Sequence, residues 1–164
     1  MKELIGHFHK LAHYEHKCNT GLLQAIRDNT VTDEKVLQLM SHISAAQTLW
    51  IMRILGENTA AAPNIWTIVP VEEIETRFLT NNDRLAKAID LLADTDKHTI
   101  SYTNLAGKHF STGLADILHH VLNHGTYHRA QIATRFKELG MQPVGTDYIL
   151  YIWESAPSLQ PCPI

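Results

Sequence analysis

The sequence predicts an all-α fold: a four-helix bundle with a short β-hairpin between the third and fourth helices. Two observations carry this prediction. Several long stretches repeat apolar residues at steps of three and four, which is the period of one helix face. One stretch between them has strand character around residues 104–107 (NLAG), which is typical of a hairpin. Because the connections are short, we expect the helices to pack as a bundle within one domain, residues 1–164.

The ends of the predicted elements follow from turn-forming residues. Gly56 and Gly140 are natural residues after a helix end, and Pro70 fits the first position of a helix. We expect the tail with Pro157, Pro161 and Pro163 to be irregular. The predicted elements are helix 4–26, helix 33–55, loop 57–69, helix 70–94, hairpin 98–111, helix 112–139 and a short amphipathic segment 147–153.

Composition narrows the class of protein. Apolar residues make up 45% and charged residues 19%, which excludes a disordered chain. No apolar run approaches the ~20 residues of a membrane span, and no secretory leader is visible, so we expect a cytoplasmic protein without membrane contact. The net charge of -3 argues against nucleic-acid binding. Two cysteines, Cys18 and Cys162, cannot form a cysteine-based zinc site.

Histidine is over-represented, with eleven in 164 residues. In the first helix, His9, His13 and His16 lie opposite the apolar stripe, so we expect them to face solvent. Glu15 is unusual because it falls within that stripe, where a carboxylate needs a partner. It would either support a buried site or reach the end of the bundle.

The fourth predicted helix holds the more informative histidines. His128 lies inside its apolar stripe and His124 at the edge, whereas His120 is rotated further out and His119 faces away. Residues four apart put two imidazoles within reach of one metal ion. On spacing alone, a pair of core histidines satisfied by hydrogen bonds is slightly favoured.

A third ligand changes this balance. The second predicted helix contains one histidine, His42, which flanks the apolar stripe and can reach the bundle interior. Three neutral imidazoles leave coordination positions open for water or substrate, which is the arrangement of a catalytic metal site. Zinc and nickel both suit imidazole, so the ligand type does not choose between them.

The segment Leu118–Ile132 (LHHVLNHGTYHRAQI) resembles the signature of the DinB/YfiT-like family of metal-dependent enzymes. The later stretches 140–143 and 147–151, and His42 followed by Trp50, also match the family pattern. Ala130 departs from it, because glycine is usual there. The resemblance implies an up-down-down-up bundle, a homodimer, and a metal held by His42, His124 and His128. Members similar to this chain include transferases and isomerases that use a low-molecular-weight thiol.

The leading hypothesis is therefore a divalent metal ion that activates water or a thiol for transfer or hydrolysis on a small-molecule substrate. The alternative is a non-catalytic, metal- or ligand-binding dimeric bundle. Gln131, Glu15 and His120 are candidates for supporting the site from around the ligands. We expect Arg129 to form a surface salt bridge and Tyr127 to project outward from the site.

Overall fold

The computed structural model describes residues 1–155, so the proline-containing tail and Cys162 lie outside the described residues. The described part is mainly helical, with one antiparallel hairpin. None of its helices is both long and apolar enough to cross a membrane. The elements are α1 (Lys2–Asp28), α2 (Glu34–Leu55), η1 (Thr59–Ala61), α3 (Val71–Asp90), η2 (Leu91–Ala93), η3 (Thr95–Lys97), β1 (Thr99–Thr103), β2 (His109–Gly113), α4 (Leu114–Glu138) and α5 (Tyr148–Ser155).

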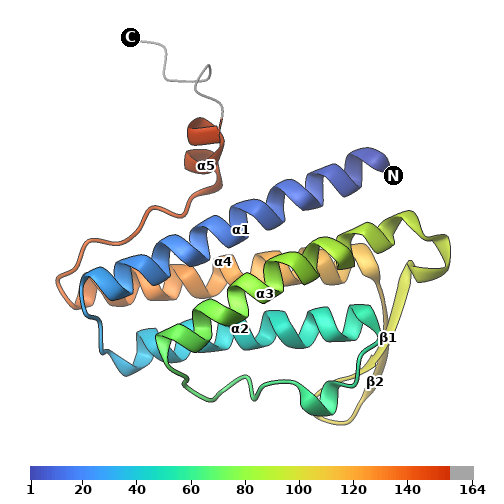
Figure 1. Cartoon of the computed structure of the whole chain (residues 1–164), viewed down its shortest axis with the longest axis horizontal. Helices are drawn as coiled ribbons and strands as arrows, with labels where there is room; N and C mark the ends of the chain where they lie inside the picture. Colours follow the sequence, from blue (N-terminus) through green and yellow to red (C-terminus); the bar gives the residue numbers. More distant parts are fainter. Residues whose placement is uncertain (156–164) are drawn as a thin grey trace.

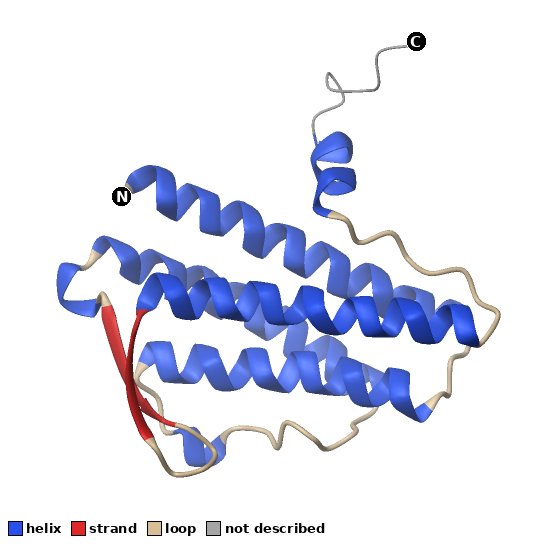
Figure 2. Ribbon diagram, turned by 180° about the vertical axis from the view of Figure 1, so that it is seen from behind, coloured by secondary structure: helices blue, strands red, loops and turns tan. Residues whose placement is uncertain are grey.

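The four long helices lie side by side, with the hairpin at one end of the bundle (Figures 1 and 2). In Figure 1, α1 and α4 run from right to left, and α2 and α3 run from left to right. Because α2 and α3 follow each other in the same direction, the chain must return along the whole bundle between them. Residues 56–70 make this return beside α2.

The second helix begins and ends as its sequence predicts. The side chain of Asp33 accepts a hydrogen bond from the backbone N–H of Val36 and so caps the first turn of α2. Gly56 ends the helix with φ of 71°, a left-handed conformation that glycine adopts without a steric penalty.

Several predicted helix boundaries differ from the observed ones by one to four residues, and two of these differences have a clear local cause. The third helix ends at Asp90 rather than Asp94, because residues 91–93 tighten into a 3₁₀ turn that leads into the hairpin. The fourth helix begins at Leu114 rather than Thr112. Thr112 pairs with Ile100 in the hairpin, and this ladder holds the chain extended for two more residues.

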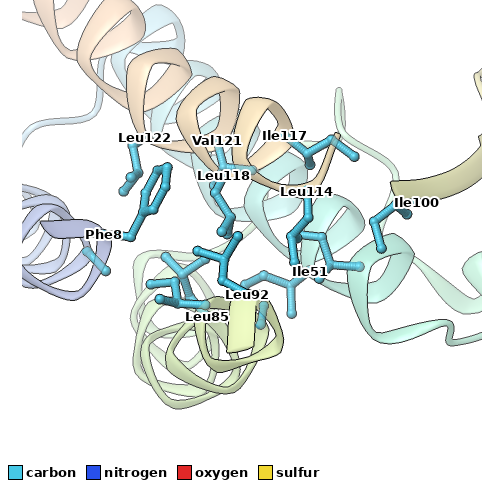
Figure 3. Close-up of a cluster of buried hydrophobic side chains, with 14 residues drawn as sticks. Phe8, Ile51, Leu85, Leu92, Ile100, Leu114, Ile117, Leu118, Val121 and Leu122 are labelled. Carbon is cyan, nitrogen blue, oxygen red and sulfur yellow. The ribbon is translucent and has the colours of Figure 1, made fainter. Parts of the chain in front are cut away.

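The larger core cluster gathers side chains from all four long helices and from β1 (Figure 3). Ile51 and Leu118 are fully buried in it, and each such side chain contributes about 1.5–3 kcal/mol through burial. Leu4 belongs to the predicted stripe but is 39% exposed, because the buried face of α1 begins only at Phe8. A second cluster fills the other end of the bundle, around Ile43, Phe78, Ile132 and Phe136.

Candidate metal centre

Three histidines from two helices converge on one point. The Nε2 atom of His124 on α4 lies 3.2 Å from Nε2 of His42 on α2 and 3.1 Å from Nε2 of His128, one turn further along α4. One ring nitrogen from each residue lies within 4.8 Å of the other two. The structure therefore brings together the three side chains that the sequence singles out, within a distance that one ion can span.

Hydrogen bonds among the three rings cannot account for this arrangement. Nδ1 of His42 lies 2.9 Å from the backbone carbonyl oxygen of Ile65, so Nδ1 carries the proton and Nε2 carries a lone pair. Nε2 of His124 has at most one proton to donate, yet it contacts two other ring nitrogens. Two nitrogen ligands of one tetrahedral zinc ion are about 3.4 Å apart, close to the distances seen here. The donor set therefore fits a shared cation.

The surroundings of the two α4 histidines lower their pKa values. The pKa of His124 is lowered to about 3, first by burial and then by repulsion from His128, His42 and His120. Burial and His42 also lower the pKa of His128, while a contact with the Gln131 side chain opposes that shift. A neutral imidazole is the form that binds a metal, so near neutral pH no proton has to leave His124 or His128 before an ion binds.

The cluster is buried on the α2 side and partly open on the α4 side. His42 is 5% exposed, whereas His124 and His128 are half-buried. Two large exposed rings border the cluster. Trp66 stacks on His42 with 4.5 Å between the ring centroids, and Tyr127 meets His128 in a T-shaped arrangement with 5.1 Å between the centroids. The site can thus hold an ion and still be reached by a small molecule.

Glu15 forms its hydrogen bonds with Arg129 and Asn19 rather than with a histidine of the cluster. It also does not reach the end of the bundle. Its carboxylate is 1% exposed and pairs with the guanidinium of Arg129 at 2.6 Å. Asn19 bonds to both partners. The prediction of a surface salt bridge for Arg129 is therefore wrong: its guanidinium is as buried as the carboxylate, because α1 packs directly over this part of α4.

The two remaining candidates lie beside the ligands on α4. Gln131 is half-buried and its side chain acts to raise the pKa of His128, although Nδ1 of His128 has no hydrogen-bond partner among the described residues. His120 is exposed, with its ring centroid 5.6 Å from that of His124 and 5.1 Å from that of Trp50. Burial lowers the pKa of His120.

The histidines of the first helix lie apart from the cluster, and they differ in how far they are exposed to solvent. His13 is exposed, as expected, and its Nδ1 lies 2.8 Å from the hydroxyl of Tyr151 on α5. His9 and His16 are half-buried rather than fully solvent-facing, because α3 packs beside α1 and His9 bonds to Asp90.

The sequence analysis missed three residues at the site. The carbonyl of Ile65 and the ring of Trp66 come from the loop after α2, and their signal in the sequence was only that this part of the loop is partly apolar. Tyr127 points outward, as predicted, but its ring still lies against His128. These contacts depend on the path of a loop and on one rotamer, neither of which a residue pattern specifies.

A helical bundle with a three-histidine cluster on facing helices defines a class of candidate metal proteins. The chain belongs to the DinB family, whose sequence model matches residues 22–160. It is similar to the Protein DinB of Bacillus subtilis (strain 168), with 26% identity over 125 residues that cover 72% of each chain. The family resemblance noted in the sequence is therefore confirmed.

Proposed function

We propose that this chain is a metal-dependent enzyme of the DinB family in which His42, His124 and His128 hold one divalent ion, zinc or nickel. The ion would act with water or a low-molecular-weight thiol on a small-molecule substrate. The bundle would be a single domain in up-down-down-up order and would work as a homodimer. The convergence of three Nε2 atoms, one of them with its lone pair fixed by the Ile65 carbonyl, carries the proposal.

In this proposal the ion would activate the nucleophile, and the chain would position the ion and the substrate. A bound divalent ion lowers the pKa of a coordinated water or thiol, so that a nucleophile is present near neutral pH. The chain holds three ring nitrogens in place and leaves the α4 side of the cluster partly open. The exposed rings of Trp66, beside His42, and Tyr127, beside His128, offer apolar surface to a small molecule at the edge of the cluster. His120, whose ring centroid lies 5.6 Å from that of His124, is the nearby side chain that can accept the proton that a thiol or water releases.

Zinc binding by purified variants tests the ligand set. We expect the wild-type chain to take up about one Zn²⁺, and His42→Ala, His124→Ala and His128→Ala each to lose most of this binding. His119→Ala is the matched control, because His119 lies exposed on the same helix. Elemental analysis after dialysis measures the stoichiometry. Full zinc occupancy in a His124→Ala/His128→Ala double variant would refute the site.

Cobalt substitution tests what binds at the open position. Co²⁺ held by three imidazoles has a visible spectrum that responds to a new ligand, and a bound thiolate adds an intense sulfur-to-metal band. We expect this band when glutathione is titrated into the Co²⁺-loaded wild-type chain, and its loss in His124→Ala. If no added thiol changes the spectrum, hydrolysis with water alone replaces thiol transfer. A spectrum unaffected by any added small ligand indicates a closed, non-catalytic site.

A further inference from the structure

The loop between α2 and α3 holds one of the three histidines from outside the bundle. The backbone carbonyl of Ile65 accepts a hydrogen bond from Nδ1 of His42, and the Trp66 ring stacks on the same imidazole at 4.5 Å with an interplanar angle of 18°. One edge and one face of the His42 ring are therefore fixed by two consecutive residues of the loop.

The loop is itself fastened to α2 and internally braced. The backbone N–H of Val69 donates to the hydroxyl of Ser41, which is 1% exposed and directly precedes His42. The side chain of Asn64 accepts from the N–H of Trp66 and shapes the turn that presents the ring. The loop thus has a defined conformation at the point where it meets the cluster.

His42 differs in this respect from the other two histidines. His124 and His128 are one turn apart on α4, so the helix alone sets their relative position. The orientation of His42 depends on a separate segment of chain. Because a metal-binding imidazole needs the correct tautomer and ring plane, any motion of this loop changes the affinity of the site.

We infer that Trp66 is a positioning residue for His42: its stacked ring, together with the Ile65 carbonyl, holds the imidazole with Nε2 aimed at His124 and His128. This inference rests on the proposed function, since it assigns Trp66 a role in metal affinity. A Trp66 that served only to fill space would not account for its 62% exposed surface or its parallel stacking on one ring.

Zinc affinity, measured by competition with a chromophoric chelator, tests the inference. We expect Trp66→Ala to weaken Zn²⁺ binding about ten-fold and Trp66→Phe, which keeps a stacking ring, to weaken it less than about three-fold. Ser41→Ala, which removes the acceptor for Val69 without touching His42, should also weaken binding. Trp153→Phe is the control, because Trp153 lies exposed on α5. Wild-type zinc affinity in a folded Trp66→Ala variant overturns the inference.

A second readout separates this inference from the proposed function. In the metal-free wild-type chain, long-range ¹H–¹⁵N spectra should show His42 as one tautomer, protonated at Nδ1. We expect a mixture of tautomers in Trp66→Ala and a single tautomer in Trp66→Phe. If the wild-type chain binds neither zinc nor nickel, the proposed function fails and the tautomer measurement alone decides the role of Trp66. A single Nδ1-protonated tautomer in Trp66→Ala would then overturn it.

Discussion

The carboxylate of Glu15 occupies the space that any side chain at position 125 would need. A Cβ atom added to Gly125 would lie 1.8 Å from Oε1 of Glu15. Gly125 directly follows the metal-ligand candidate His124, and the partner of Glu15, Arg129, directly follows His128. The close approach of α1 to a glycine on α4 therefore lets a buried ion pair fix the helix turn that presents both histidines.

Gly125→Ala should destabilise the protein by about 3 kcal/mol, since the new methyl group displaces Glu15 from its ion pair. A loss of stability would be informative, because replacing glycine by alanine within a helix normally stabilises the protein. Urea denaturation of the metal-free chain measures the change. Gly21→Ala is the control: nothing lies within 4 Å of an added Cβ there, and we expect a gain of about 0.5–1 kcal/mol.

Removing one partner of the buried ion pair should cost more than removing both. Glu15→Gln leaves the fully buried Arg129 cation without its carboxylate, and we expect a loss of about 3 kcal/mol. Adding Arg129→Met should recover part of this loss, because no uncompensated charge then remains. A double-mutant cycle in urea measures the coupling. Strictly additive effects of the two substitutions would show that the pair contributes nothing as a pair.

Stability of the metal-free chain should decrease in mild acid. The folded pKa of His124 is about 3, below the value of about 6.5 expected in the unfolded chain. Between these values the unfolded state binds a proton that folded His124 does not, so stability is full above pH about 6.5 and falls as pH drops towards 3. Because the ring is only half-buried, we expect a loss of about 1 kcal/mol between pH 6.5 and 5.

A His124 variant and the pH dependence of zinc binding provide controls for this prediction. His124→Gln should flatten the decrease, although burial also lowers the pKa values of His128, His120 and His16, which act in the same direction. Zinc should be retained at about pH 5–6 and released only further below, because only neutral imidazole binds it and the folded pKa of His124 is about 3. Retention of zinc below pH about 3, where His124 itself is protonated, would indicate carboxylate ligands and contradict the three-histidine set.

Arg53 should stabilise the hairpin against α2. Its guanidinium lies 4.5 Å from the ring centroid of Trp50 and 4.9 Å from that of Tyr102, and it donates to the carbonyl of Thr103. We expect Arg53→Ala to cost about 1–2 kcal/mol through the lost cation–π contacts. Lys17→Ala, which removes an exposed ion pair with Glu154, should leave stability almost unchanged in the same thermal or urea assay.

Local sequence pattern predicted the helices well because their signals are local. The apolar repeat and the caps at Asp33 and Gly56 depend on residues within one or two turns. The same geometry put His124 and His128 on one face, four residues apart. His42 could be proposed as their partner because it is the one histidine in the second helix.

What the sequence by itself determined is thus the class of fold, the order of its helices and hairpin, and the three histidines worth testing. Only the tertiary structure decided that Glu15 pairs with Arg129, 114 residues away, and that Ile65 and Trp66 hold His42. The physical reason is that helical periodicity reports which face of a segment is apolar. It does not specify how that segment is rotated against its neighbours, nor the path of the loop that crosses them.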